Sequence, residues 1–290
     1  MGLSLSKNLV RNNIEVVGYD SMAEVKAEEV GESFTTVDSL ANLVAALPQP
    51  RIVWMMVPAG EVTRNVVLEL KGLLSKEDII IEGGNSFYKD SIALNEELAE
   101  EGIYFLDCGT SGGMSGALNG GNFMIGGQQE AFNQVEHIFE KVACQDGYLY
   151  TGASGSGHYL KMVHNGIEYG MMAAIGEGFD LLEHSQFDYN NEKVAKLWNN
   201  GSVIRSWLIE LAEEAFKKDP KLDDIQGIMY SSGEGKWTVE DALERQVAIP
   251  VITMALMMRY RSLENDTFTG KVVASLRKGF GGHAVKKSDN

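Results

Sequence analysis

The first half of the chain alternates short apolar runs with amphipathic stretches, and no other feature of the sequence constrains the fold as strongly. The apolar runs are five to seven residues long and rich in Ile, Val, Phe and Met. Continuous apolar strands separated by helices are typical of a parallel, doubly wound sheet with helices on both faces. The expected strands cover residues 14–20, 51–57, 78–84, 103–107 and 122–127, and the expected helices include residues 39–47 and 61–74.

The strand pattern stops near Gly152, where the segment GASGSG separates it from long helical periodicity. The first helix expected there runs from about Ser156 to Ser185. A length of 290 residues also suggests two domains rather than one. The sequence therefore predicts an α/β fold class, with a doubly wound parallel-sheet (Rossmann) domain at residues 1–151 followed by an all-α domain at residues 152–290.

The charge balance argues against two classes of partner. Lys and Arg total 25 and Asp and Glu total 41, which gives a formal net charge of −16. Nucleic acids and anionic membrane surfaces both require basic patches, so neither is expected as a partner. An anionic small substrate is compatible with this balance, because a local cluster of cations can dominate a single site.

Other short signals indicate a cytoplasmic protein. The longest apolar run, residues 52–57, is far shorter than the ~20 residues that span a bilayer. No secretory signal precedes a cleavage site, and the opening MGLSLS matches a myristoylation pattern only formally. Cys108 and Cys144 are too far apart for a CxxC motif and are expected to be buried thiols in a reducing compartment. No metal site is expected.

The chain opens with a helical stretch, MGLSLSKNLVRNN, followed by a strand that ends in Asp20. In a dinucleotide-binding unit this order is the second half of a βαβ motif. Gly2 would then be the third glycine of GxGxxG, and Asp20 would hold the ribose hydroxyls. One glycine and one aspartate also match by chance. On the dinucleotide interpretation, we expect the native protein to begin roughly a dozen residues upstream, with a strand and two glycines before Met1.

The run GSGHYLKMVHNGIEYG, residues 155–170, carries the strongest candidate site. On a helix, Lys161, His164, Asn165 and Glu168 fall within one stripe. A solvated surface stripe has the same spacing, but the apolar residues around this one favour a polar face that lines a cleft. A lysine and a carboxyl can divide base and acid work if the lysine is desolvated or near a cation and the carboxyl is buried.

This run closely resembles the substrate-binding helix of the 6-phosphogluconate dehydrogenase family. Further motifs follow in that family's order: VPAG at 57–60, GGNS at 83–86, SGG at 111–113, GKWT at 235–238 and RKGFGGH at 277–283. The resemblance covers essentially the whole chain and is nearest to the short, NAD-type bacterial branch. It implies that the all-α domain binds substrate and forms the contacts between subunits.

The resemblance implies oxidative decarboxylation of 6-phospho-D-gluconate to D-ribulose 5-phosphate and CO2, with reduction of NAD, in the pentose phosphate pathway. Lys161 would take the proton of the 3-hydroxyl while C3 passes hydride to the nicotinamide, and would then return a proton to the carbonyl oxygen. Glu168 would protonate C2 of the enediol. The positions that match substrate contacts are Asn85, Ser111, Gly112, Gly113, His164, Asn165, Tyr169, Arg277 and His283.

Two groups of these residues can be interpreted further. Gly112 and Gly113 also fit a tight turn that needs glycine for backbone reasons alone. Tyr169, Arg277 and His283 match phosphate-binding positions, and the planar guanidinium of arginine suits bidentate phosphate contact.

The cofactor is expected to be NAD in preference to NADP. A carboxylate at Asp20 accepts hydrogen bonds from free ribose hydroxyls and repels a 2′-phosphate, and no cation lies between Asp20 and Lys26. The residues expected to contact the cofactor are Gly2, Asp20, Val57, Pro58, Ala59 and Asn85.

The resemblance also predicts a homodimer or homotetramer with shared active sites, because in the family the C-terminal arginine and histidine reach a partner subunit's site. Two departures from the family pattern affect the phosphate site. Ser232 and Glu234 stand where longer members carry a Lys and a Thr. The second phosphate-binding arginine has two candidates, Arg259 and Arg261.

Two other functions fit parts of the sequence. A different β-hydroxyacid dehydrogenase, of the 3-hydroxyisobutyrate type, would share the architecture and Lys161 but would lack His164, Glu168 and His283. A catalytically impaired nucleotide-binding paralogue would explain the incomplete dinucleotide motif. The retention of both Lys161 and Glu168 argues against that second alternative.

Overall fold

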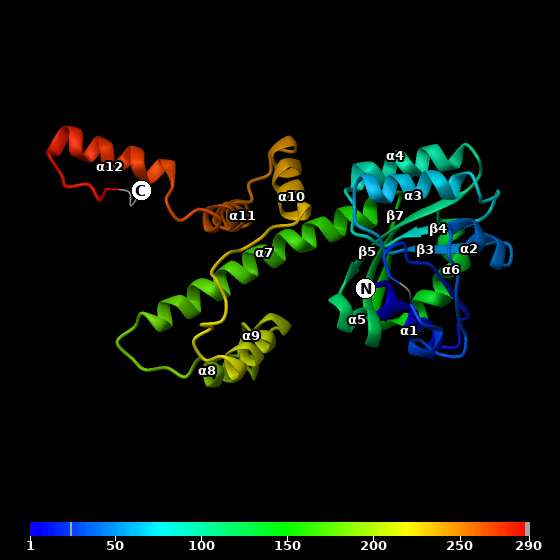
Figure 1. Ribbon diagram of the computed structural model, residues 1–290, viewed down its shortest axis with the longest axis horizontal. Coiled ribbons are helices and arrows are strands. Elements are labelled where there is room, and N and C mark those ends of the chain that lie inside the picture. Colours follow the sequence, from blue (N-terminus) through cyan, green and yellow to red (C-terminus); the bar gives the residue numbers. More distant parts are fainter. Residues whose placement is uncertain (24, 288–290) are drawn as a thin grey trace. The chain divides into compact units, whose positions relative to one another are not determined.

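The computed structural model describes residues 1–23 and 25–287 and divides into two compact units, Met1–Asn165 and Gly166–Asn290 (Figure 1). The strands are β1 (Val16–Gly18), β2 (Phe34–Thr36), β3 (Ile52–Met55), β4 (Ile79–Glu82), β5 (Tyr104–Ser111), β6 (Gly121–Gly127) and β7 (Ala143–Gly152). The α-helices are α1 (Gly2–Arg11), α2 (Leu40–Ala46), α3 (Glu61–Lys71), α4 (Tyr88–Ala99), α5 (Gly113–Asn119), α6 (Gln129–Val142), α7 (Ser156–Glu183), α8 (Asn191–Asn199), α9 (Trp207–Lys218), α10 (Gly233–Glu244), α11 (Pro250–Ser262) and α12 (Phe268–Gly281), with a short 3-10 helix at Ala27–Glu29.

The strands of the first unit form two sheets. β1 and β2 pair in parallel, and β3 to β7 lie side by side in sequence order. β3, β4 and β5 are parallel, β6 is antiparallel to β5, and β7 is parallel to β6. Among the described residues, no ladder joins the two sheets. The carboxyl ends of β3, β4 and β5 meet at one edge, which is where open parallel sheets bind ligands.

Alternate side chains of β4 enter the two apolar cores that cover the faces of the larger sheet. Ile79 and Ile81 pack in a cluster with Phe139 of α6, whereas Ile80 packs in a cluster with Leu70 of α3 and residues of α4. Helices therefore cover both faces, as Figure 1 shows. Because strand residues are buried on both sides, the strands read as continuous apolar runs in the sequence.

The doubly wound α/β fold expected from the sequence is confirmed, with one strand reversed and two strands added. β6 is antiparallel to β5 because residues 112–120, which connect them, are too few for a crossover, which needs a dozen or more. β2 and β7 were not expected. β2 is only three residues long, and β7 is an edge strand whose exposed Gln145 and Asp146 hide it from a search for apolar runs.

The prediction of buried thiols is confirmed for Cys108 and wrong for Cys144. Cys108 lies in β5 with no exposed surface, and burial raises the pKa of its thiol far above the ordinary value. Cys144 is exposed because it belongs to the solvent-facing beginning of the edge strand β7. Neither cysteine forms a disulfide.

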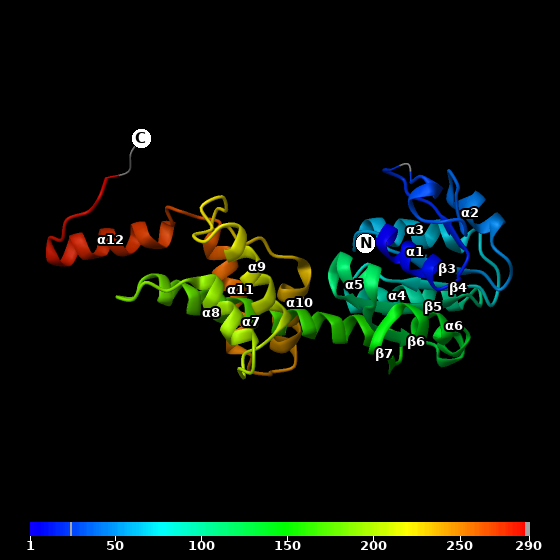
Figure 2. The same ribbon diagram turned by 90° about the horizontal axis from the view of Figure 1, so that it is seen from below.

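The second unit contains helices and, among its described residues, no strand (Figure 2). Tyr169 packs with Leu256 in one small core, and Phe179 packs with Ile209 in another. Helix starts follow local sequence: Asn190, Ser206 and Thr267 cap α8, α9 and α12 through their side chains, and a proline opens α11. The described part of the chain contains no helix that is both long and apolar enough to cross a membrane.

Candidate active site

The first turn of α7 lies against the strands at very close range. A Cβ added at Gly109 of β5 would overlap the Cβ of Lys161. One added at Gly157 would overlap the carbonyl oxygens of Met124 and Asp107. Glycine at these two positions lets the helix backbone approach the sheet, and this approach places Lys161 directly over β5.

Lys161 belongs to a polar cluster with His164, Asn165 and Ser111. Lys161 is only 5 % exposed, and its Nζ lies 3.4 Å from His164 Nδ1. The same ring nitrogen lies 2.9 Å from Asn165 Oδ1, and the opposite ring nitrogen lies 3.3 Å from Ser111 Oγ. Because Nδ1 holds at most one proton, its contacts with the amine and with the amide oxygen are coupled. Removal from water is also the condition under which a lysine amine works as a base.

Asn85 follows β4 and ties the GGNS turn to β5. Its backbone is left-handed, with φ of 58°. Its Oδ1 accepts the Thr110 amide at 2.8 Å, and its Nδ2 donates to the Thr110 carbonyl at 3.0 Å. Ser111, the next residue of β5, is the one that reaches His164. The turn after β4 and the lysine cluster are therefore joined through two adjacent residues of β5.

The glycines of the SGG motif have a backbone explanation that requires no ligand. Gly112 has φ of 97° and Gly113 has φ of 61°, both in the left-handed region that favours glycine. The tight-turn interpretation therefore accounts for the residue type at both positions.

Asp20 and Gly2 lie in the amino-terminal part of the first unit. Asp20 is exposed just after β1, and its Oδ1 accepts the amides of Met22 and Ala23 at 2.8 and 3.1 Å. These two bonds fix the orientation of the carboxylate. Gly2 begins α1, and a Cβ there would lie 3.6 Å from the Cβ of Met56, an ordinary contact. Packing at this point would therefore accept alanine.

The segment Val57–Ala59 leaves the carboxyl end of β3 beside the GGNS turn. A Cβ added at Gly84 would overlap the Val57 carbonyl oxygen. The Pro58 carbonyl accepts the Thr63 hydroxyl at 2.9 Å, which holds the loop on the start of α3. The loops expected to contact cofactor after β3 and β4 therefore lie against each other.

Glu168 and Tyr169 lie farther along α7, in the second unit. Glu168 is partly exposed, two turns after Lys161 on the same helix, and this differs from the burial expected for a carboxyl that acts as the acid. Tyr169 is 4 % exposed, and its hydroxyl oxygen accepts the Ser232 amide at 3.0 Å and lies 3.1 Å from Ser232 Oγ. Ser232, which the sequence resemblance places at the position of a lysine in longer relatives, is the N-cap residue of α10.

The two candidate arginines of α11 have different surroundings. The guanidinium carbon of Arg259 lies 3.5 Å from the centre of the Tyr169 ring, and Arg259 also donates to the Tyr230 carbonyl at 2.8 Å. Arg261 instead donates to the Glu264 carbonyl. Of this pair, Arg259 is the residue that the structure places beside Tyr169.

Arg277 and His283 belong to the carboxyl-terminal part of the second unit. Both are exposed, and α12, which carries Arg277, has no buried residue. The His283 ring contacts Phe280 edge-on at 6.1 Å.

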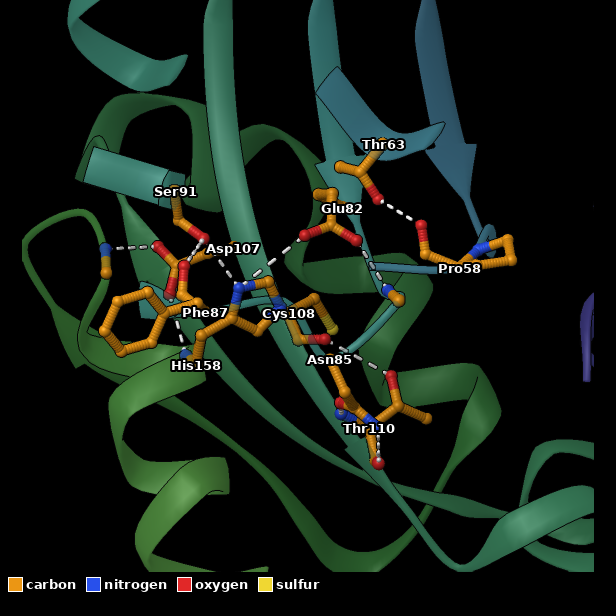
Figure 3. Close-up of polar contacts among 12 residues, drawn as sticks. Pro58, Thr63, Glu82, Asn85, Phe87, Ser91, Asp107, Cys108, Thr110 and His158 are labelled. Atoms are coloured by element: carbon orange, nitrogen blue, oxygen red, sulfur yellow. Dashed lines mark hydrogen bonds and ion pairs between the residues drawn. The ribbon is translucent and has the colours of Figure 1, made fainter. Parts of the chain in front are cut away.

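Analysis of the sequence missed a buried polar network that holds α7 on the sheet (Figure 3). Its members are Glu82, Ser91, Asp107 and His158, and each is at most 1 % exposed. Two of them could have been found, because Glu82 and Asp107 directly follow the apolar runs at residues 79–81 and 103–106. The described residues contain no cluster of three or more His, Cys, Asp or Glu that could hold a metal ion.

Comparison with known proteins identifies the family of this chain. The family model described as the NAD binding domain of 6-phosphogluconate dehydrogenase matches residues 1–152, and the one described as the 6-phosphogluconate dehydrogenase C-terminal domain matches residues 157–288. The chain belongs to the 6-phosphogluconate dehydrogenase family. The resemblance inferred from the sequence motifs is thereby confirmed.

Two relatives match nearly the full chain. The Bacillus subtilis (strain 168) protein named "Putative 6-phosphogluconate dehydrogenase YqeC" is 58% identical over 99% of this chain and 96% of its own length. The "6-phosphogluconate dehydrogenase, NAD(+)-dependent, decarboxylating" of Haloferax volcanii is 42% identical over 95% of this chain and 92% of its own length.

Solved structures extend the comparison. The Plasmodium falciparum 6-phosphogluconate dehydrogenase superposes with a TM-score of 0.80 at 30% identity, and the match covers all of this chain but 65% of that one. A Mycobacterium tuberculosis 3-hydroxyisobutyrate dehydrogenase superposes with a TM-score of 0.70 at 21% identity, covering 96% of both chains. The latter similarity concerns the fold alone.

Proposed function

We propose that this protein catalyses the NAD-dependent oxidative decarboxylation of 6-phospho-D-gluconate to D-ribulose 5-phosphate and CO2. The observation that carries the proposal is the nearly buried Lys161, held beside His164 on a helix that bears Glu168 two turns later, in a chain of this family. The relative from Haloferax volcanii, which is named as NAD(+)-dependent and decarboxylating and matches 95% of this chain, supports the same reaction.

The residues around the strand ends fit a nicotinamide cofactor. Asp20 presents a carboxylate at the end of β1, and the loops after β3 and β4 lie against each other at the edge of the sheet where such cofactors bind. Bound NAD would supply the hydride acceptor. The chain's own contribution would be to orient it, with Asp20 at the ribose and Val57, Pro58, Ala59 and Asn85 at the nicotinamide side.

Lys161 is proposed to act in three proton transfers at the oxygen on C3. Its neutral amine takes the proton of the substrate 3-hydroxyl as the C3–H bond breaks, which leaves a carbonyl at C3. Loss of CO2 from the adjacent carbon then leaves its electron pair in an enediol, as the protonated Lys161 returns a proton to the former carbonyl oxygen. Glu168 would finally donate a proton to C2 of that enediol while the neutral Lys161 takes the proton of the C3 hydroxyl, which restores the carbonyl and completes the ketose.

The phosphate end of the substrate is proposed to bind Tyr169, Ser232 and Arg259. The Tyr169 hydroxyl, the Ser232 hydroxyl and amide, and the Arg259 guanidinium lie together in the second unit. Arginine can bind phosphate through two parallel hydrogen bonds. In this assignment Arg259 supplies the positive charge that Ser232 no longer provides at the place of the family's lysine.

The site is proposed to be completed by a second copy of the chain. α12 presents Arg277 on a helix with no buried residue, and the exposed apolar side chains of that helix include Phe268, Leu276 and Phe280. Such a helix is stabilised when a partner covers it. A homodimer or homotetramer in which Arg277 and His283 enter a partner's site accounts for both features. The cytoplasmic location stays a prediction.

The reaction is tested by its stoichiometry. Purified protein is mixed with 6-phosphogluconate and NAD, and NADH, CO2 and ribulose 5-phosphate are measured over time. We expect the three products to accumulate in equal amounts. NADH without CO2 would indicate a dehydrogenase that does not decarboxylate, and the absence of NADH would contradict the proposal.

A further inference from the structure

Two buried carboxyl groups lie side by side, one at the end of β4 and one in the middle of β5. Glu82 and Asp107 are directly opposite each other in the ladder of these parallel strands, and neither has any exposed surface. Like charges opposite each other in a sheet repel, and burial raises the cost because water no longer solvates them. A pair of this kind needs compensating groups close by.

Backbone amides at the amino-terminal end of α7 bind the buried carboxylate of Asp107. Asp107 Oδ1 accepts the Gly155 amide at 2.6 Å, and Oδ2 accepts the His158 amide at 2.9 Å. A carboxylate at this position satisfies amides that have no partner within the helix, and it meets the positive end of the helix dipole. Asp107 of β5 therefore caps the amino-terminal end of α7.

The His158 side chain lies beside Glu82. Its Nδ1 lies 3.6 Å from Glu82 Oε2 and 2.8 Å from Ser91 Oγ of α4 (Figure 3). Glu82 Oε2 has no hydrogen bond among the described residues, so the imidazole is the polar group that the structure places beside it. His158 and Lys161 are three residues apart on α7, which puts them on neighbouring positions of one helix turn.

Glu82 also holds the turn that carries Asn85. Its second oxygen, Oε1, accepts the Gly84 amide at 2.7 Å. The same carboxyl group thus contacts the GGNS turn through one oxygen and the first turn of α7 through the other. A change at Glu82 or His158 would alter the distance between the turn and the helix without touching any group that contacts substrate.

We infer that Glu82 and His158 are positioning residues that lock the first turn of α7, and with it Lys161, against the GGNS turn. This inference rests on the proposed function in so far as Lys161 is the base. Misplacement of a catalytic group by about 1 Å can lower a rate ~100-fold. Loss of the His158 imidazole should therefore lower kcat much more than it changes KM.

The test compares two substitutions of His158 with a control next to β4, the strand that carries Glu82. His158→Leu removes the polar ring, whereas His158→Asn keeps a polar atom near the position of Nδ1. Asp78→Asn is the control. Asp78 is also a buried carboxylate, with 1 % exposure, and it pairs with Arg51 at 3.0 Å. It lies immediately before β4, whereas Glu82 lies at the other end of that strand. For each variant we would measure kcat, KM, Tm and hydrogen–deuterium exchange in residues 155–163.

For His158→Leu we expect kcat to fall roughly 10- to 100-fold with KM within about threefold, and exchange in residues 155–163 to rise. His158→Asn should recover most of the loss. Asp78→Asn should lower Tm but leave both kcat and exchange in that segment near the wild-type values. If His158→Leu does not fold, Ser91→Ala, which removes the hydroxyl bonded to Nδ1, should show the same pattern to a smaller degree.

Three results would overturn the inference. The first is unchanged kcat and unchanged hydrogen–deuterium exchange in His158→Leu, and the second is a kcat in His158→Asn as low as in His158→Leu. The third is a change of kcat and exchange in Asp78→Asn as large as in His158→Leu. If the wild-type protein does not oxidise 6-phosphogluconate, the proposed function fails. The exchange data alone then decide whether His158 holds α7, since they need no turnover.

Discussion

Lys161 and Glu168 share one helix but have different surroundings, and their proposed roles differ accordingly. Lys161 is almost fully buried beside a histidine, where an amine loses solvation. Glu168 is partly exposed, so it can exchange its proton with solvent between turnovers. The sequence placed both residues on one face from helical spacing alone, but it did not show which neighbours each would have.

Substitution of the base and of the acid should affect different steps. Lys161→Met removes the group that takes the hydroxyl proton, so oxidation should fall by roughly 10²- to 10⁴-fold. Glu168→Ala should leave oxidation less affected and slow the protonation of C2, which can be followed as the incorporation of solvent deuterium into ribulose 5-phosphate. Near-normal turnover in either variant would refute that residue's role.

Cofactor choice depends on Asp20. Its carboxylate is held by two backbone amides at the end of β1, where it would accept ribose hydroxyls and repel a 2′-phosphate. We expect kcat/KM for NAD to exceed that for NADP by about tenfold or more, because juxtaposed like charges cost several kcal/mol. Asp20→Ala should bring the ratio of kcat/KM for NAD to kcat/KM for NADP closer to one. A wild-type preference for NADP would contradict the assignment.

At the scale of elements, the sequence predicted the parts whose pattern is local. The strands before α3 and α4 and the long helix after Gly152 were visible because each is a continuous apolar or periodic run. The antiparallel β6 depends on a connection length, and the network of Glu82 and His158 joins residues 76 positions apart. Such pairings are properties of the folded sheet, so a pattern search along the chain did not find them.

The two arginines of α11 offer a matched pair of variants. Arg259 stacks on Tyr169, whereas Arg261 contacts the Glu264 carbonyl. Arg259→Ala should raise KM for 6-phosphogluconate by roughly 10- to 100-fold, since hydrogen bonds to charged groups contribute about 1.5–3 kcal/mol. Arg261→Ala should change KM little. A larger effect at Arg261 would reverse the assignment.

At the scale of the whole molecule, the helix α12 of the second unit bears on the predicted assembly of the chain. Arg277 and His283 are both exposed, and α12, which carries Arg277, has no buried residue. The resemblance to the family predicted a partner subunit for these residues, and an uncovered α12 is consistent with that hypothesis.

Sharing of sites between subunits can be tested by mixing inactive variants. Lys161→Met and Arg277→Ala protomers should each be nearly inactive alone. A hybrid dimer would have one site with both substitutions and one with neither, so equal mixing should restore roughly a quarter of wild-type activity. Hybrids that are shown to form but remain inactive would contradict a shared site.

The most direct test of the proposed function is a comparison of kcat/KM for 6-phosphogluconate, unphosphorylated gluconate and 3-hydroxyisobutyrate, each with NAD. A site with the lysine cluster on α7 and with Arg259 beside Tyr169 should favour 6-phosphogluconate over both alternatives by at least about 100-fold, and should release CO2 from it. A preference for 3-hydroxyisobutyrate, or equal rates with gluconate and its phosphate, would contradict the assignment of substrate and site together.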